Sequence, residues 1–234
     1  MKDQIKYGNT LINYQLDFVE RKSLAIKVHP DKSVNVIAPK GSSIQKVREK
    51  VRKKAPWIVR QQDFFLSFHP LTPARKFISG ETHLYLGKQY RLKLHTDLQS
   101  SVKLAGGFIN VYIDNIEDKA RIEKLLNNWY REKATYHFEQ LFKENLAFAK
   151  SLHNEEPKLS LRWMKKRWGS CSKDGKILLN LELIKAPKKC IEYVIVHEIC
   201  HLKYLNHSNS FYNLLNNTYP DWKATKDRLE RIMV

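Results

Sequence analysis

Cysteine is scarce in this chain, and its spacing excludes two common kinds of site. Only three cysteines occur in 234 residues, and no two of them form a Cys-x-x-Cys pair. A zinc ribbon and a thioredoxin-like redox site both need such a pair. Cys190 and Cys200 fall on one predicted helix about 15 Å apart, too far to bridge each other. The cysteine content therefore favours a reducing compartment.

Long apolar segments are also missing. The longest uninterrupted run lies around residues 193–196 and is far shorter than the roughly 20 residues that cross a bilayer. The first residues, Met1 to Tyr7, lack the apolar core of a secretory signal. We therefore expect no membrane partner and a cytoplasmic location.

Glycine and proline are few, at eight residues each. These numbers exclude collagen-like and proline-rich chains. A hydrophobic share of 42%, with aromatic residues at 11%, excludes general disorder. A chain of this length can form one large domain or two small ones, each with its own core.

Acidic residues are outnumbered by basic ones. The chain has 42 lysines and arginines against 24 acidic residues, a formal net charge of +18. Because such proteins attract polyanions, we expect non-specific contact with nucleic acid through the basic surface. The densest basic cluster consists of Lys46, Arg48, Lys50, Arg52, Lys53 and Lys54. A solvated helix face explains the same cluster, since lysine and arginine also serve solubility.

The first half of the chain has the pattern of strands. Short alternating apolar runs occupy residues 11–39 and return over residues 82–113, and the sequence shows no internal repeat. Between these regions, Ser42 or Ser43 can cap a helix that Pro56 kinks or splits. We predict a strand-rich N-terminal subdomain with one helix over residues 1–115.

The second half has the pattern of a helix, a small sheet and further helices. Asp118 can cap a long helix that reaches Phe148. An Asp174-Gly175 turn between two apolar runs predicts a hairpin. The expected strands are 159–164, 168–172 and 177–183, and the expected later helices begin at Pro187, running to about Leu205, and after Ser208 and Asp221. With residues 116–234 as the second subdomain, we predict an α+β fold.

The helix predicted after Pro187 carries the motif His197-Glu198-Ile199-Cys200-His201. A spacing of four residues puts His197 and His201 on one helix face, where two imidazoles can reach one zinc ion. Glu198 lies beside such a metal and can hold and deprotonate a zinc-bound water. Cys200 falls off the shared face, so we interpret it as a small core residue.

A catalytic zinc ion needs a third protein ligand and an open position. His207 lies six residues after His201, past the expected helix end, and Asn206 can adopt the left-handed conformation that turns the chain back. We predict that His207 is the third ligand, and the alternative is an acidic residue, Asp221 or Glu230.

Two tyrosines near the motif have more than one interpretation. Tyr193 lies one turn before His197 on the same helix face, where it can support a metal ligand, face the substrate or simply pack. Tyr204 is equally undecided.

Beyond the motif, the chain resembles the YgjP-like metal-dependent hydrolases, relatives of the SprT-like zinc metallopeptidases. The segments that carry the resemblance are Arg167–Ser172, Ile177–Asn180, Pro187, Tyr193–Glu198, Asn206–Ser208, Phe211, Pro220-Asp221 and, in the first half, Arg21–Ser23, Val34–Pro39, Trp57-Ile58 and Leu86–Tyr90. The resemblance implies a zincin-type second half: a backing helix, a small sheet, the HExxH helix and a third histidine. SprT-like relatives that act on DNA-bound protein often carry an extra zinc module, and the lack of Cys-x-x-Cys pairs weakens that role here.

Three hypotheses for function follow. The first is peptide hydrolysis: His197, His201 and His207 bind one zinc ion, and Glu198 acts as general base and then acid. Other divalent metals suit the same ligands. An extended peptide could pair with the sheet edge near residues 163–172.

The second hypothesis keeps the metal site and changes the substrate to a phosphoanhydride, as in a nucleoside triphosphate (UTP-type) pyrophosphatase, an activity that the resemblance also allows. Basic residues of the predicted hairpin suit phosphate binding. The residues expected to contact substrate are Arg162, Lys166 and Arg167, with Lys165 nearby, together with Tyr193 and Tyr204.

The third hypothesis is a nucleic-acid-associated protein with a structural metal, docking through residues 46–54. A closed metal site would need a fourth protein ligand, and the sequence offers no obvious one. The sequence leaves the natural substrate and the oligomeric state open.

Overall fold

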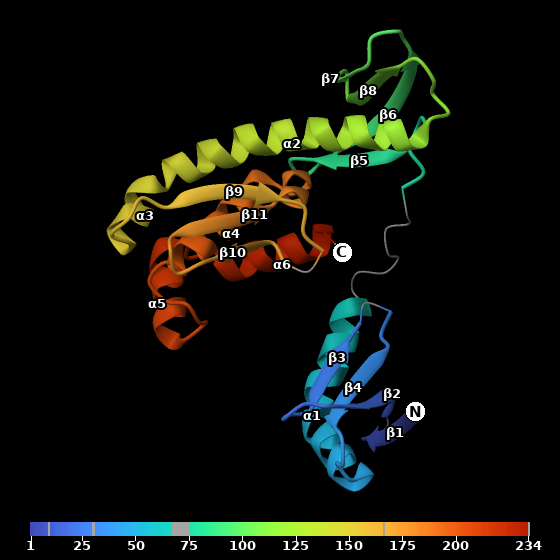
Figure 1. Cartoon of the computed structure of the whole chain (residues 1–234), viewed down its shortest axis with the longest axis vertical. Coiled ribbons are helices and arrows are strands. Elements are labelled where there is room, and N and C mark those ends of the chain that lie inside the picture. Colours follow the sequence, from blue (N-terminus) through green and yellow to red (C-terminus); the bar gives the residue numbers. More distant parts are fainter. Residues whose placement is uncertain (9, 30, 67–74, 166, 234) are drawn as a thin grey trace. The chain divides into compact units, whose positions relative to one another are not determined.

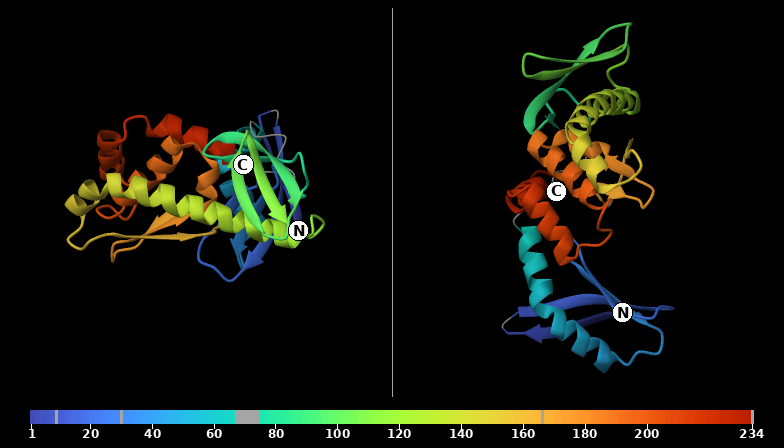
Figure 2. Two further views of the ribbon diagram at one scale, coloured as in Figure 1. Left: turned by 90° about the horizontal axis from the view of Figure 1, so that it is seen from above. Right: turned by 90° about the vertical axis from the view of Figure 1, so that its left-hand side faces the viewer.

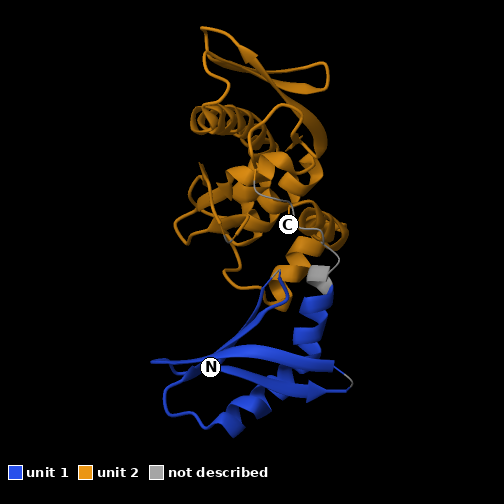
Figure 3. Ribbon diagram, turned by 90° about the vertical axis from the view of Figure 1, so that its right-hand side faces the viewer, with its two compact units in different colours: residues 1–72 blue, residues 73–234 orange. Residues whose placement is uncertain are grey.

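The computed structural model describes residues 1–8, 10–29, 31–66, 75–165 and 167–233. They form two compact units, Met1–Thr72 and Pro73–Val234 (Figure 3). Each unit has its own buried core. The predicted α+β class is confirmed, with most strands in the first half of the chain (Figure 1).

The first unit is a four-stranded sheet covered by one helix. Its strands are β1 (Lys2–Tyr7), β2 (Thr10–Val19), β3 (Ala25–Val28) and β4 (Val34–Pro39), in the order β1-β2-β4-β3. The central pair β2–β4 is parallel, and both outer pairs are antiparallel. Helix α1 (Ile44–Leu66) contacts β1 and β3.

Helix α1 is attached to this sheet by a single apolar stripe. The Lys46 main-chain N–H donates to Ser43 Oγ (3.4 Å), as expected of a helix cap. Pro56 lies within the helix and does not split it. The buried side chains recur every three or four residues and are at most 1% exposed: Val47, Val51, Ala55 and Ile58. The charged residues of α1 up to Arg60 are all exposed.

The second unit begins with a sheet of the same topology. Its strands are β5 (Thr82–Tyr85), β6 (Lys88–Thr96), β7 (Ser101–Ala105) and β8 (Phe108–Ile113), in the order β5-β6-β8-β7. The central pair is again parallel and the outer pairs antiparallel, and a long helix again follows the fourth strand. The described residues thus contain a repeated topology that the sequence did not reveal, because strand order depends on apolar alternation and turn positions more than on residue identity.

A second, smaller sheet follows in the second unit. Its strands are β9 (Lys158–Arg162), β10 (Gly169–Cys171) and β11 (Lys176–Asn180), in the order β10-β11-β9. The predicted hairpin is confirmed: β10 and β11 are antiparallel around Asp174-Gly175, with Gly175 at φ 74°. The last part of the third predicted strand is instead a 3-10 helix, η1 (Leu181–Lys185). Strand β10 lies at the edge of this sheet.

The remaining helices of this unit are α4 (Lys188–Cys200), α5 (Asn209–Thr218) and α6 (Trp222–Met233). Helix α4 carries the HExxH motif, and nine of its 13 residues are buried. It is shorter than predicted, since it ends at Cys200 and not near Leu205. Pro187 occupies the N-cap position, one residue earlier than expected. Ser208 caps α5, as predicted, by accepting from the Phe211 main-chain N–H (3.4 Å).

Helix α2 (Lys119–Glu144) runs alongside both sheets of the second unit (Figures 1 and 2). Asp118 caps it by accepting from the Arg121 main-chain N–H (3.0 Å). The helix contacts β7 and β8, and also β9, η1 and α4. The predicted long helix is interrupted at Asn145, whose Nδ2 donates to Leu141 O (2.9 Å), and α3 (Leu146–Leu152) follows. The predicted order of backing helix, small sheet and HExxH helix is observed.

The predicted subdomain boundary at residues 115/116 falls inside the second compact unit. The turn between β5 and β6 is hydrogen-bonded to η1, which precedes α4. The Leu86 and Gly87 main-chain N–H groups donate to Ile184 O (2.9 Å) and Lys185 O (3.0 Å). A Cβ atom on Gly87 would lie 2.6 Å from Pro187 Cγ. The β5–β8 sheet therefore packs with the helices that follow it. None of the described helices combines the length and apolar composition needed to cross a membrane.

Candidate metal centre

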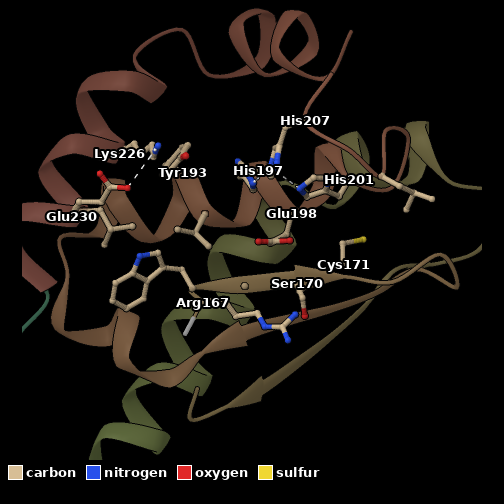
Figure 4. A pocket seen from close by; sticks show the side chains of 15 residues that line it. Arg167, Ser170, Cys171, Tyr193, His197, Glu198, His201, His207, Lys226 and Glu230 are labelled. Carbon is tan, nitrogen blue, oxygen red and sulfur yellow. Dashed lines mark hydrogen bonds and ion pairs between the residues drawn. The ribbon is translucent and has the colours of Figure 1, made fainter. Parts of the chain in front are cut away.

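Three histidine side chains converge at one point of the second unit (Figure 4). His207 Nε2 lies 3.1 Å from His197 Nε2 and 3.2 Å from His201 Nε2. Nitrogen ligands of a tetrahedral zinc ion with bonds of 2.0–2.1 Å lie about 3.3 Å apart. The spacing of the three nitrogens therefore fits a single metal ion of this size.

The surroundings of two imidazoles, His201 and His197, suit metal binding. His201 Nδ1 lies 2.8 Å from Tyr204 O, so its N–H can donate to this carbonyl and leave Nε2 with a free lone pair. Burial, together with nearby His201 and His207, lowers the pKa of His197 to about 3. This favours the neutral imidazole that binds metals. His197 Nδ1 is buried and has no hydrogen-bond partner among the described residues.

The turn after α4 brings His207 back toward the helix. The main-chain N–H groups of Leu202 and Lys203 donate to Ile199 O (3.0 Å) and Cys200 O (3.2 Å), which tightens the end of the helix. Asn206 does not adopt the predicted left-handed conformation. Among the described residues other than glycine, those with a positive φ are Lys32, Phe77 and Leu86. Hydrogen bonds between residues three and four apart form the turn that follows Cys200 instead. Cys200 is fully buried, as predicted.

Phe211 supports all three imidazoles at once. Its ring centroid lies 5.0 Å from that of His197, 4.5 Å from that of His201 and 4.8 Å from that of His207. Phe211 is fully buried and lies in the first turn of α5, which Ser208 caps. The cap thus fixes the start of the helix whose aromatic ring lies against the histidine cluster. Sequence reasoning assigned no role to Phe211.

The Glu198 carboxyl group lies between the histidine cluster and strand β10 (Figure 4). It is 5% exposed, and burial raises its pKa to about 8 although nearby Arg167 acts in the opposite direction. A Cβ atom on Gly169 would lie only 2.5 Å from Glu198 Oε1. Gly169 therefore leaves the space that the carboxyl group occupies. A glycine inside a short strand was the sequence signal for such a close approach.

A cavity of about 440 Å³ opens beside these groups. Its walls come from α4, α6, the His207 turn and the edge strand β10. The residues that line it include Arg167, Gly169–Cys171, Tyr193, His197, Glu198, His201, His207, Lys226 and Glu230. Lys226 Nζ lies 3.7 Å from Glu230 Oε1. The cavity combines the three histidines and Glu198 with a strand edge.

Asn180 positions the loop that carries Arg167. It is 2% exposed, and its Nδ2 donates to Met164 O (2.8 Å) and Arg167 O (3.0 Å). Its Oδ1 accepts from the main-chain N–H groups of Met164 and Glu182, both at 3.1 Å. One buried amide thus joins the loop between β9 and β10 to the end of β11. The sequence did not reveal this role of Asn180, because its hydrogen-bond partners are main-chain groups of a loop, which no sequence motif marks.

The residues predicted to contact substrate are only partly brought together. Arg167 and Tyr193 line the cavity, and the Tyr193 ring lies 5.9 Å from that of His197. Arg162 lies on β9, which β11 separates from β10, and it does not line the cavity. Tyr204 contacts His201 through its main-chain carbonyl, and its side chain lies outside the cavity lining. Lys166 lies outside the described residues.

The alternative third ligands have different positions. Glu230 lines the cavity, where it is paired with Lys226, whereas Asp221 does not line it. The group of side chains close enough to share an ion consists, among the described residues, of His197, His201 and His207.

A family model for the metallopeptidase domain of YgjP-like proteins matches residues 22–232. The chain belongs to the YgjP-like family. The match covers most of the chain: it includes nearly all of the second unit and the first unit from residue 22 onward, and the family implies a metal-dependent hydrolase.

Solved structures with similarity to this chain include two metallopeptidase zymogens. Abylysin of Pyrococcus abyssi is 28% identical with a TM-score of 0.34, over 40% of this chain and 99% of abylysin. Jannalysin of Methanocaldococcus jannaschii is 24% identical with a TM-score of 0.34, over 40% of this chain and 85% of jannalysin. No curated protein sequence matches the chain.

Proposed function

We propose that this YgjP-like chain is a zinc-dependent peptidase with His197, His201 and His207 as metal ligands and Glu198 as its general base and acid. The observation that carries the proposal is the convergence of three Nε2 atoms, at 3.1 and 3.2 Å, next to a buried carboxyl group in a cavity. The donor set is three neutral nitrogens, which suits one zinc ion with an open position.

When bound, zinc would act as a Lewis acid that polarises the carbonyl of the scissile peptide bond. Glu198 accepts a proton from the attacking water at its carboxylate and returns it to the leaving amine. Gly169 supports this role because it lets the carboxyl group lie against β10 without a clash. Phe211 and the Tyr204 carbonyl hold the imidazole rings in orientation.

An extended peptide is the substrate that the cavity suits best. Strand β10 lies at a sheet edge and lines the cavity, so its outer main-chain groups can pair with a substrate strand. This narrows the predicted pairing edge to Gly169–Cys171. Arg167, at the start of this edge, makes no ion pair with any described acidic residue and favours a peptide with an acidic side chain nearby.

A second candidate function is hydrolysis of a phosphoanhydride at the same site. The observation in its favour is that Arg167 and Lys226 both line the cavity, since cationic side chains bind phosphates well. Lys226 is already paired with Glu230, and Arg162 lies elsewhere, so a multi-residue phosphate clamp is less complete than the sequence predicted.

The test compares zinc-loaded wild type with Glu198→Gln, with bound zinc quantified in both. Unfolded, reduced protein and a panel of nucleoside triphosphates serve as substrates. We expect peptide cleavage that falls by about 10²–10⁴-fold in Glu198→Gln while zinc is retained.

The matched control is Glu230→Gln, which makes the same chemical change at another carboxyl group of the cavity. It should keep peptide cleavage within a few fold of wild type. Cleavage that survives Glu198→Gln with zinc bound would contradict the mechanism. Glu198-dependent nucleotide hydrolysis without peptide cleavage would establish the second candidate instead.

A further inference from the structure

One face of α1 in the first unit carries a regular line of basic side chains around a tryptophan. Its members recur at intervals of four, three, four and three residues, so they share one helix face, and all are exposed. We call this face the cationic stripe, and it consists of Lys46, Lys50, Lys53, Trp57 and Arg60. At 1.5 Å per residue it extends over about 21 Å.

The buried side of α1, over the residues whose side chains the structure describes, packs in the core of the first unit. Val47, Val51, Ala55 and Ile58 are at most 1% exposed against the sheet. Over residues 44–63, whose side chains the structure describes, the helix therefore has no free apolar face to insert into a lipid surface. Trp57, in contrast, is 37% exposed and lies between the basic residues of the stripe.

The charges of the stripe are not neutralised within the protein. In the described part of the chain, none of its lysines, nor Arg60, lies within ion-pair distance of an acidic side chain, whereas neighbouring Arg48 pairs with Asp3 at 2.7 Å. Residues 1–72 contain 14 lysines and arginines against six acidic residues. Lys46, Lys50 and Lys53 also line a groove of about 320 Å³ between α1 and residues Leu24 and Pro39, in which Glu49 is the acidic lining residue. The surface is therefore complementary to an extended polyanion.

We propose that the cationic stripe binds single-stranded nucleic acid, with its lysines on phosphates and Trp57 stacked on an unpaired base. A basic track that holds the backbone and an aromatic ring that stacks a base are the two parts such a surface needs. An unpaired strand has accessible base faces, whereas the stacked bases of a duplex have none for Trp57 to contact. The proposal concerns the first unit and does not depend on the reaction in the second.

The test measures fluorescence anisotropy of a fluorescein-labelled oligothymidylate titrated with the full chain at several salt concentrations. The combined variant Lys46→Glu, Lys50→Glu and Lys53→Glu should weaken binding by about tenfold or more. It should also reduce the slope of log K against log salt by about two, since each phosphate contact on a single strand contributes about 0.7. Trp57→Ala should weaken binding about fivefold or more, and Trp57→Phe should restore most of the loss.

The matched control is Lys119→Glu, Lys124→Glu and Lys143→Glu, which changes net charge equally at exposed lysines of the second unit. It should change affinity by less than about threefold, and circular dichroism should show every variant folded. Equal weakening by both triple variants would overturn the proposal in favour of general charge attraction. Equal binding of duplex and single strand with no effect of Trp57→Ala would also overturn it, as would no binding of the oligonucleotide at low salt. Tighter binding to phosphatidylserine vesicles, lost in the stripe variant, would assign the surface to a membrane instead.

Discussion

The two four-stranded sheets have the same strand order, but the helices that follow them differ in what they bury. Over residues 44–63, helix α1 buries the small and aliphatic side chains of one stripe and leaves its charged residues exposed. Helix α2 buries seven residues, including Trp129, Tyr130 and Phe138, because it packs on β9, η1 and α4 as well as on its own sheet. The comparison shows that one topology can provide either an exposed charged face or a scaffold for a metal centre. Side-chain composition makes the difference.

Helix α4 extends the comparison to the functional groups themselves. Most of its residues are buried, and its histidines and Glu198 reach the cavity from a helix fixed on several sides. Such a site can hold reacting groups in narrowly defined positions. An exposed face such as that of α1 suits an extended and adaptable partner.

Removing one imidazole should have the largest effect on activity, because the second unit would then lose the metal site that distinguishes it from the first unit. We expect His207→Ala to lose most bound zinc and about 10³-fold or more of the hydrolytic activity, because the metal supplies several kcal/mol of transition-state stabilisation. Mass spectrometric metal analysis and peptide hydrolysis measure both effects. His95→Ala, which removes a histidine stacked on Tyr112 in the β5–β8 sheet, is the control and should retain both properties.

Truncating a large side chain of α2 should destabilise the metal-bearing unit. Phe138 is fully buried, so Phe138→Ala should cost about 3–5 kcal/mol of unfolding free energy. Chemical denaturation, followed with zinc retention, measures the loss. Ile58→Ala on α1 should cost about 2–5 kcal/mol in the first unit and leave zinc retention unchanged. Loss of zinc in Ile58→Ala would show that the units depend on each other more than their separate cores indicate.

Adding one methyl group at β10 should test how closely Glu198 is positioned. In Gly169→Ala the new Cβ would lie 2.5 Å from Glu198 Oε1, so the carboxyl group must shift. A shift of about 1 Å in the carboxyl group should lower kcat by about 100-fold while zinc remains bound. Ser170→Ala, at the next position of the strand, should stay within about threefold of wild-type kcat. Unchanged kcat in Gly169→Ala would contradict the assigned role of this glycine.

Asn180→Ala removes the amide that holds the loop carrying Arg167, so it should destabilise this loop. The change leaves loop carbonyls and N–H groups without partners, and we expect a loss of about 2 kcal/mol in unfolding free energy. Urea denaturation measures this loss, and KM should rise with it if Arg167 contacts substrate. The control Asn128→Ala removes an exposed amide of α2 and should change stability by less than about 0.5 kcal/mol.

The smallest expected effect belongs to the polar contact that joins α1 to its sheet. Arg48 holds Asp3 through Nε and Nη2 and thereby lowers the pKa of the Asp3 carboxyl group, which Tyr14 also contacts. Arg48→Ala should lower the unfolding free energy at neutral pH by less than any of the destabilising changes above, because the guanidinium group is exposed.

Because the pKa of Asp3 is lowered on folding, this contribution is present above its ordinary pKa of about 4 and is lost as the pH falls below that value. The difference between wild type and Arg48→Ala in urea denaturation should therefore shrink at acidic pH. Lys40→Ala, which removes an exposed pair with Glu20, should have a smaller effect at every pH. A difference that grows at low pH would contradict the assignment.

Much of the second unit could be predicted because its patterns are local. The Asp174-Gly175 hairpin and the Ser208 cap depend on a few neighbouring residues, and both are confirmed. Arg162 was misplaced because its sequence distance from Arg167 is short, while β11 separates β9, which carries Arg162, from β10, which follows the Arg167 loop. The six-residue basic cluster likewise divides in space, since Arg48 turns to Asp3 and away from the stripe.

The sequence alone determined that His197 and His201 lie on one face at the end of a helix, within reach of a single ion, because helical periodicity fixes the spacing of side chains on a face. It also placed His207 within a short turn of them. Only the tertiary structure decided that the Glu198 carboxyl group lies against Gly169, that Phe211 supports three imidazoles and that Asn180 holds the Arg167 loop. These contacts join different helices, strands and loops, and packing between such elements follows from the shape of the folded core, which no local spacing encodes.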